Sequence, residues 1–213
     1  GQRILVDGNI FENMWPSAQV GFAMTWTPRQ GSVLSNQPWT VVKDITITNN
    51  IFKNTANGIA ISGQDPGTVG KEPATSIGGR FLFKNNIFLN IGGYTGTGIV
   101  FQIANSIFDL TIQHNTVATY APIPTGTGLR FLYKDSANVI SPIPRFILQD
   151  NIFQARNYPF FASGCQTSNL AEGGLPEYVW TNNVFAGPWP TPVGCASKFS
   201  PQGNGNSYPA GVS

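Results

Sequence analysis

An eleven-residue phrase recurs six times along the chain, and its seventh position is asparagine in every copy. Each copy runs approximately in the order charge, apolar, any residue, apolar, polar, turn residue, Asn, Ile, Phe, any residue, Asn. The copies are RILVDGNIFEN (3–13), DITITNNIFKN (44–54), RFLFKNNIFLN (80–90), DLTIQHNTVAT (109–119), RFILQDNIFQA (145–155) and EYVWTNNVFAG (177–187). Their starts lie 41, 36, 29, 36 and 32 residues apart. Repeats of this length predict a stacked solenoid.

Each phrase predicts two short strands joined by a tight corner, because apolar and polar residues alternate before a turn residue. The corner position holds Gly, Asn, His or Asp, which tolerate a left-handed backbone best. These corner residues are Gly8, Asn49, Asn85, His114, Asp150 and Asn182.

The residue after each corner is asparagine in all six copies. Because stacked strands lie about 4.8 Å apart, the side-chain amides of these asparagines are expected to form a hydrogen-bonded ladder. Its members are Asn9, Asn50, Asn86, Asn115, Asn151 and Asn183. Two positions later, an apolar column is expected from Phe11, Phe52, Phe88, Val117, Phe153 and Phe185.

A third strand follows most phrases, at 20–26, 58–63, 98–103, 128–134 and 159–163. Three strands per repeat are typical of a parallel β-helix, and the crossover rule favours the right-handed form. With its asparagine ladder and aromatic stack, residues 3–187 resemble the right-handed parallel β-helix proteins of the pectin lyase-like superfamily. The expected fold is an all-β, single-stranded right-handed parallel β-helix of about six coils.

Composition restricts the function classes, because only 10% of the residues are charged and the net charge is +2. This charge balance predicts no strongly positive surface for nucleic-acid binding. No apolar run reaches the ~20 residues of a membrane span. No phosphate loop, zinc spacing or calcium loop occurs, so no metal site is predicted.

The chain divides into a parallel β-helix (1–187) and a Pro/Gly-rich C-terminal cap or tail (188–213). The first repeat has no capping segment before it, which suggests coils upstream in a longer protein or self-association through this end. Cys165 and Cys195 lie about one coil apart, so they form either a disulfide or two buried thiols. A disulfide favours a secreted, periplasmic or cell-surface location.

The first position of the phrase alternates strictly in charge: Arg3, Asp44, Arg80, Asp109, Arg145 and Glu177. A structural ionic ladder is favoured over a catalytic Asp/Arg site, because every charge has opposite neighbours. The only histidine, His114, occupies a corner position, so a turn role accounts for it without catalysis.

Enzymes of the resembled superfamily work on the outer face of one sheet. On the third strands, the alternation predicts outward Ala23, Thr25, Ala60, Ser62, Val100, Gln102, Arg130, Leu132 and Lys134. This face lacks the two carboxylates of glycoside hydrolysis. Arg130 and Lys134, with Asp135 beside them, are the catalytic candidates for lyase chemistry, in which Ca²⁺ is a possible cofactor. The alternative is that these charged side chains are merely solvated and have no catalytic role.

Two long insertions, 14–43 and 64–79, are expected to border a groove. The substrate-binding candidates are Trp15, Arg29, Trp39, Asp65, Lys71, Glu72, Tyr94 and Gln102. Tryptophan faces suit sugar rings, although Trp15 and Trp39 also suit the covering of a sheet edge. Trp26 continues the inward alternation and is expected in the core.

The sequence therefore indicates an extracellular module that binds or processes polysaccharide. Whether it is an enzyme stays open; if it is, the resemblance implies a polysaccharide lyase or a glycoside hydrolase. The alternative is a structural or self-assembling cell-surface β-solenoid without catalysis.

Overall fold

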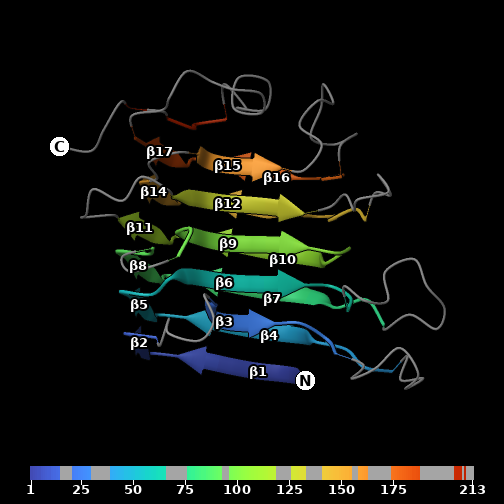
Figure 1. Cartoon of the computed structure of the whole chain (residues 1–213). Helices are drawn as coiled ribbons and strands as arrows, with labels where there is room; N and C mark the ends of the chain where they lie inside the picture. Colours follow the sequence, from blue (N-terminus) through green and yellow to red (C-terminus); the bar gives the residue numbers. More distant parts are fainter. Residues whose placement is uncertain are drawn as a thin grey trace.

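The computed structural model of the chain contains parallel strands in three sheets (Figure 1). It describes residues 1–14, 21–29, 39–65, 76–92, 96–118, 126–132, 141–154, 158–162, 174–187, 204–207 and 209. Within these ranges there are strands and turns but no helix. The all-β prediction is confirmed for this part of the chain.

Each sheet is built from every third strand. The first sheet contains β1 (Gln2–Asp7), β4 (Lys43–Thr48), β7 (Gly79–Lys84), β10 (Phe108–Gln113), β13 (Ile147–Gln149) and β16 (Val179–Thr181). The second contains β2 (Ile10–Glu12), β5 (Ile51–Lys53), β8 (Ile87–Leu89), β11 (Thr116–Ala118), β14 (Ile152–Gln154) and β17 (Val184–Ala186). The third contains β3 (Phe22–Trp26), β6 (Asn57–Ser62), β9 (Ile99–Ala104), β12 (Thr127–Leu132) and β15 (Tyr158–Ala162).

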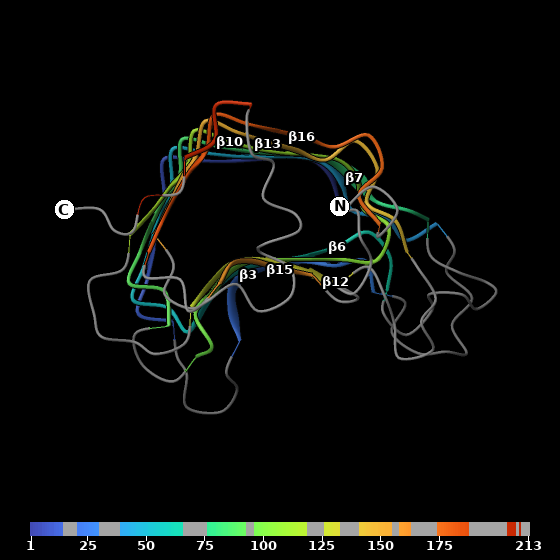
Figure 2. The ribbon, with the colours of Figure 1, turned by 90° about the horizontal axis from the view of Figure 1, so that it is seen from above.

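One coil is defined here as a set of consecutive strands that contributes one strand to each sheet. Equivalent positions of successive phrases are register partners, for example Ile4 with Ile45 and Phe11 with Phe52. Viewed from above, the strands of successive coils overlie one another around a common interior (Figure 2). This arrangement is compatible with a parallel β-solenoid.

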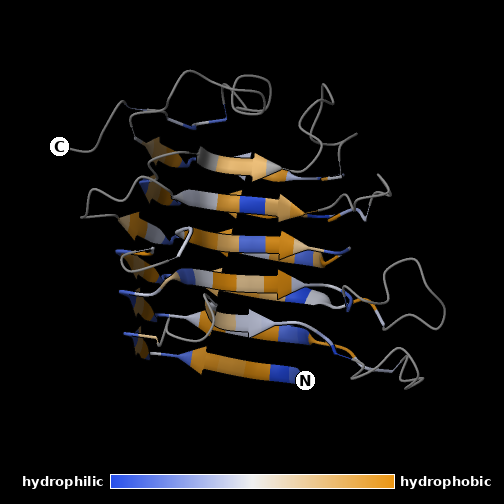
Figure 3. Cartoon of the chain, in the orientation of Figure 1, coloured by the Kyte–Doolittle hydropathy of each residue, from blue (hydrophilic) through white to orange (hydrophobic). Residues whose placement is uncertain are grey.

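The interior is filled by the inward side chains of the alternating strands. Ile45, Ile47, Phe81 and Phe83 are at most 2% exposed, and apolar residues run along the strands of every coil (Figure 3). The predicted aromatic column is present in two segments, which Val117 separates. The rings of Phe11, Phe52 and Phe88 stack with centroids 4.8 Å apart, and those of Phe153 and Phe185 lie 5.5 Å apart.

A left-handed residue lies at each corner of the coil. The predicted corner position has φ between 54° and 67° in all six copies. Two further phrase positions share this conformation, namely the charged first position and the eleventh position where it is Asn13, Asn54 or Asn90. The first position bends the chain where it enters the first sheet, and the eleventh where it leaves the second. The sequence indicated only one of these three bends.

The asparagine ladder is confirmed, and its geometry repeats from coil to coil. The backbone N–H and Nδ2 of Asn50 both donate to Oδ1 of Asn86, at 3.0 Å each. The Nδ2 of a ladder asparagine also donates to a backbone carbonyl of the preceding coil; for example, Nδ2 of Asn86 donates to the carbonyl of Ile47. Each buried ladder amide therefore joins three coils through hydrogen bonds that its side chain both donates and accepts.

The ladder continues beyond the sixth phrase, into the region expected to be a cap or tail. The backbone N–H and Nδ2 of Asn183 donate to Oδ1 of Asn206, and Ser207 forms a parallel bridge with Val184. Gly205 has φ of 72°, as a corner residue does. Residues 204–207 therefore repeat the corner of the phrase as a seventh rung of the ladder. The repeat pattern does not predict this rung, because the apolar residues that precede the corner in the other copies are lacking.

Candidate functional site

The outer face of the third sheet carries one straight row of side chains across five coils. Register pairs join Thr25 to Ala60, Ala60 to Gln102, Gln102 to Arg130, and Arg130 to Phe161. Successive members lie on neighbouring strands, about 4.8 Å apart. The parallel pairing thus brings two residues predicted for the site, Gln102 and Arg130, into adjacent positions. We call these five residues the outer row.

Exposure varies along the outer row. Phe161 is 39% exposed, Gln102 and Arg130 are half-buried, and Thr25 is exposed. In contrast, Ala60 is only 8% exposed, and its outward neighbours Ser62 and Val100 are 5% and 2% exposed. The outward orientation predicted from alternation therefore exposes only part of this face. Its accessible section is centred on Gln102, Arg130 and Phe161.

Phe161 was not among the predicted site residues. It follows Phe160, which is 1% exposed and packs on Trp180 with ring centroids 5.1 Å apart. Two consecutive phenylalanines on one strand must point to opposite faces, so one is core and the other is outward. This alternation was the signal in the sequence that identifies Phe161 as an aromatic side chain next to Arg130.

A second polar group lies beyond the carboxyl ends of β3 and β6. Arg29 forms an ion pair with Asp65 at 3.6 Å, and the two side chains are 67% and 11% exposed. Both residues were predicted for the site, and the structure brings them together. Close by in the chain, Ser62 Oγ donates to the Gln64 carbonyl and accepts a hydrogen bond of 2.9 Å from Nδ2 of Asn105.

The turn after β9 supports this polar group with an uncommon backbone. Asn105 and Ser106 are consecutive non-glycine residues with φ of 55° and 60°. Such a conformation costs on the order of 1 kcal/mol per residue. Gly63 lies so close that a Cβ there would be 2.4 Å from the Asn105 carbonyl oxygen. A side chain at Gly63 would therefore displace the turn that holds Asn105 against Ser62.

The remaining predicted site residues fall into two groups. Trp39 is 71% exposed just before β4, so its ring is on the surface and its ligand-binding role stays a prediction. Eight positions lie outside the described residues: Trp15, Lys71, Glu72, Tyr94, Lys134, Asp135, Cys165 and Cys195. The predicted strand over 128–134 is described only to its end at Leu132. The catalytic group of Arg130, Lys134 and Asp135 and the disulfide therefore stay predictions.

Trp26 belongs to the core, as expected. Its ring packs edge-on against Phe81 at a centroid distance of 6.3 Å. Its Nε1 is buried without a hydrogen-bond partner. Trp26 therefore contributes packing rather than a sugar-binding surface.

The alternating charges form discrete pairs rather than a continuous ladder. Arg80 hydrogen-bonds Asp44 through Nε and Nη2, and Arg145 hydrogen-bonds Asp109 through Nε. The ring of Phe108 lies 5.8 Å from the guanidinium carbon of both arginines. The Arg80 hydrogen bond holds the pKa of Asp44 below its ordinary value. The structural prediction fits this geometry, because Asp44 and Asp109 are each paired with an arginine.

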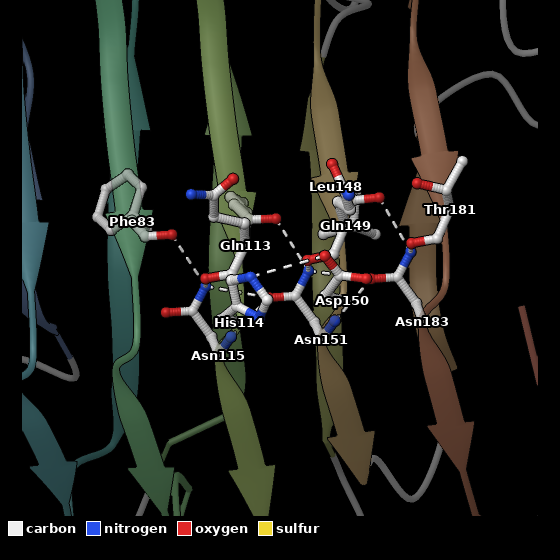
Figure 4. A network of polar contacts seen from close by, with 11 residues as sticks. Phe83, Gln113, His114, Asn115, Leu148, Gln149, Asp150, Asn151, Thr181 and Asn183 are labelled. Carbon is white, nitrogen blue, oxygen red and sulfur yellow. Dashed lines mark hydrogen bonds and ion pairs between the residues drawn. The ribbon is translucent and has the colours of Figure 1, made fainter. Parts of the chain in front are cut away.

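His114 also has a structural position. It is a left-handed corner residue with φ of 54°, and its Nε2 lies 3.6 Å from Oδ2 of Asp150, the corner residue of the next coil. Figure 4 shows this contact beside the ladder formed by Asn115, Asn151 and Asn183. The turn role predicted for His114 accounts for both its backbone and its contact.

The third sheet carries basic, amide and aromatic side chains on its described strands. Its five described strands contain no aspartate or glutamate, so they provide no carboxylate pair for glycoside hydrolysis. Among the described residues, no group of three or more His, Cys, Asp or Glu is arranged to hold a metal ion. The accessible section contains the aromatic ring of Phe161, the guanidinium of Arg130 and the amide of Gln102. The guanidinium suits carboxylate groups and the amide suits hydroxyl groups.

Comparisons with known proteins add no relative to this description. No protein-family model matches the sequence, and neither curated proteins nor solved structures give a significant match. In the described part of the chain, no helix has the length and apolar character needed to cross a membrane.

Proposed function

We propose that this chain is a right-handed parallel β-helix of the pectin lyase-like type that binds polysaccharide on the outer face of its third sheet. The observation that carries the proposal is the register of Gln102, Arg130 and Phe161 on three successive strands. A row of polar and aromatic side chains across several coils suits a long, chain-like ligand. A secreted, periplasmic or cell-surface location follows from this ligand.

The mixed character of the row supports an acidic or neutral glycan. An aromatic ring provides a flat apolar face for a sugar ring, while the guanidinium binds carboxylates through paired N–H donors. Gln102 adds both a donor and an acceptor for hydroxyl groups. Because the described strands of the third sheet carry no carboxylate, the proposal favours binding over hydrolysis. Lyase chemistry through Arg130, Lys134 and Asp135, with Ca²⁺, is the catalytic form of the same proposal.

Affinity electrophoresis tests the proposal. The folded chain is run through gels that contain pectin, polygalacturonate, xylan, mannan, alginate or a soluble cellulose derivative. We expect retardation by at least one polymer, and roughly tenfold weaker binding for Phe161→Ala and for Arg130→Ala, as for residues central to an interface. Trp39→Ala measures the contribution of the neighbouring insertion.

Matched controls on the first sheet distinguish a site from a general loss of surface. Lys84→Ala removes a cation and Val179→Ala removes an apolar side chain that is 42% exposed, and both are expected to bind like the parent. If no polymer retards the folded parent, or if the controls weaken binding as much as the site variants, the proposal is wrong.

A structural role without catalysis is the second candidate, since one observation favours it. Among the described residues, β1, β2 and β3 at one end of the stack and β15 and β16 at the other each pair with a single neighbouring strand, and unpaired strand edges can template further strands. Self-assembly through such edges would give the chain a structural role that does not depend on polysaccharide binding.

A further inference from the structure

Three dipeptides along the chain place an acid or an amide directly before glycine: Asp7–Gly8, Asn57–Gly58 and Asn204–Gly205. In such a dipeptide, the glycine nitrogen can attack the side-chain carbonyl carbon of the preceding residue, because glycine has no Cβ that hinders the approach. The reaction requires that these two atoms come close together, so the fold decides which dipeptide reacts. The structure places the three dipeptides in three different environments.

The amide of Asn57 is held by hydrogen bonds on both of its ends. The residue begins β6 and is 3% exposed. Its Oδ1 accepts from Oγ1 of Thr97 at 2.9 Å and from the backbone N–H of Ile99 at 3.1 Å. Its Nδ2 donates to the Gly21 carbonyl at 3.3 Å. Turning this amide toward the Gly58 nitrogen would break all three bonds, so the fold protects Asn57 from cyclisation.

Asp7 is exposed but is protected in a different way. Its Oδ1 accepts hydrogen bonds of 2.7 Å from Oγ1 of Thr48 and from Nδ2 of Asn49, which hold the pKa of Asp7 below its ordinary value. The Gly8 nitrogen also has a partner, since its N–H donates to the Thr48 carbonyl at 3.2 Å. An ionised carboxylate resists attack by a nitrogen nucleophile, so Asp7 is a poor site for cyclisation.

Asn204–Gly205 has neither form of protection. Both residues are exposed in the turn that makes the corner of the seventh rung, with φ of 48° and 72°. The backbone carbonyl of Asn204 accepts from the Asn182 N–H at 2.9 Å. Among the described residues, however, no hydrogen bond is formed with the Asn204 side chain or with the Gly205 N–H. The amide and the attacking nitrogen are therefore both accessible and unrestrained by hydrogen bonds.

We propose that Asn204 is a site of spontaneous deamidation and that its isoaspartyl product opens the seventh rung. The Gly205 nitrogen forms a bond to Cγ of Asn204, and the bond from Cγ to Nδ2 breaks. The proton of the Gly205 N–H leaves with Nδ2 as ammonia, and a cyclic imide results. Water then opens this imide at one of its two carbonyl carbons, which gives aspartate at one carbon and isoaspartate at the other.

The isoaspartyl product lengthens the main chain directly before the corner, because the chain then passes through Cβ and Cγ of residue 204. Asn206 lies two residues later, and its Oδ1 accepts from the backbone N–H and Nδ2 of Asn183 at 3.0 and 3.1 Å. The product also moves the carbonyl of residue 204 away from the Asn182 N–H. The hydrogen bonds that end the ladder therefore depend on an unmodified main chain at residue 204, which gives the seventh rung a finite chemical lifetime.

Peptide mapping of aged protein tests the site. The folded chain is incubated at mildly alkaline pH, and mass spectrometry of its peptides measures conversion of amide to acid at Asn204 and Asn57. We expect Asn204 to react roughly tenfold faster than Asn57 or more, and to give both aspartate and isoaspartate. In urea the two Asn–Gly dipeptides are expected to react at similar rates, because the fold no longer protects Asn57. Equal rates in the folded chain, or continued protection of Asn57 in urea, would overturn the proposal.

Hydrogen exchange at Asn183 tests the consequence for the ladder. The isoaspartyl fraction is separated from the aged sample and compared with the fresh parent and with fresh Asn204→Asp, which carries the new charge on an ordinary main chain and tolerates the left-handed backbone. We expect severalfold faster exchange in the isoaspartyl fraction alone. Parent-like exchange in that fraction, or equally fast exchange in Asn204→Asp, would overturn the role of main-chain length.

Asn204→Gln is the control for ageing. Its longer side chain would have to close a six-membered imide, which forms much more slowly than the five-membered imide of asparagine. We expect this variant to keep the exchange rate of its own fresh sample at Asn183 throughout the incubation. If exchange in aged Asn204→Gln rises as it does in the aged parent, another modification opens the rung and the proposal is wrong.

Discussion

The two ends of the stack are covered differently. At the C-terminal end, Asn206 accepts both donors of Asn183, and Asn183, Phe185 and Trp180 are at most 1% exposed. At the N-terminal end, Asn9 is exposed and Phe11 is half-buried, although the same phrase surrounds them. Equivalent positions of the phrase therefore differ in burial, because burial depends on the coil above or below.

The C-terminal end shows that a segment of four residues is enough to continue the asparagine ladder. Residues 204–207 provide one left-handed corner, one amide and one bridging residue, and no named strand flanks them among the described residues. The polar corner is thus the part of the coil that must be satisfied, since an unpaired buried amide costs about 1–3 kcal/mol.

The largest expected difference between end and interior concerns the aromatic stack. Phe88→Ala leaves a cavity between Phe52 and Phe101 and is expected to reduce the free energy of unfolding by about 3–5 kcal/mol. Phe11→Ala is expected to lose less than half as much, because one side of its ring is already open. Urea unfolding of both variants measures the two losses. Equal losses would mean that the first coil is covered as completely as the third.

The asparagine ladder sharpens the same comparison. Asn86→Ala leaves the backbone N–H and Nδ2 of Asn50 and the carbonyl of Ile47 without this partner, so we expect a loss of roughly 3 kcal/mol or failure to fold. Asn9→Ala removes donors only, and Asn50 Oδ1 still accepts from the backbone of residue 9; we expect about 1 kcal/mol. A larger effect at residue 9 than at residue 86 would contradict the ladder geometry.

The seventh rung gives a smaller, local effect. Asn206→Ala removes the acceptor of two Asn183 donors, and we expect a loss of about 1–2 kcal/mol with faster hydrogen exchange at Asn183. Gly205→Ala is an independent variant, because its φ is 72° and a Cβ would lie 2.1 Å from Oδ1 of Asn182. If both variants exchange like the parent, residues 204–207 do not protect the ladder.

Much of the fold was predictable because the repeat shows itself in the sequence. The invariant asparagine identified the ladder, and alternation placed Ile45, Ile47, Phe81 and Phe83 inside. The left-handed first position was not predictable, since Arg and Glu rarely adopt that conformation and they occupy four of its six copies. The seventh rung was missed because its signal is only Gly205, Asn206 and a following apolar stretch that does not repeat.

The candidate site was less predictable because it depends on register between strands. Alternation indicated that Gln102 and Arg130 face outward, but only the pairing of β9 with β12 makes them neighbours. Solvent exposure was still harder to predict from the sequence. The alternation places Val100 and Ala60 on the outer face, but both side chains are buried. The Arg29 and Asp65 pair joins two insertions whose lengths follow no repeat, so sequence spacing gave no distance between them.

The smallest expected effect concerns the charge at the end and in the interior. The hydrogen bond from Arg80 lowers the pKa of Asp44 below its ordinary value of 3.8, so ionised Asp44 stabilises the fold. This contribution is complete above that value and is lost as the pH falls through the lower pKa of the folded state. The pair is partly exposed, with side chains 46% and 30% accessible, so screening keeps the effect small.

Asp44→Asn tests this relation and keeps a residue that tolerates the left-handed backbone. We expect its melting temperature to lie slightly below that of the parent at pH 6 and to converge with it as the pH falls through the lowered pKa of Asp44, where the parent's carboxylate becomes protonated. Arg80→Ala should reproduce this pH dependence, whereas Arg3→Ala should show much less of it, because Arg3 forms no ion pair with a described acid. A pH-independent difference for Asp44→Asn, or an Arg3→Ala effect as large as that of Arg80→Ala, would show that the end and the interior do not differ in charge pairing.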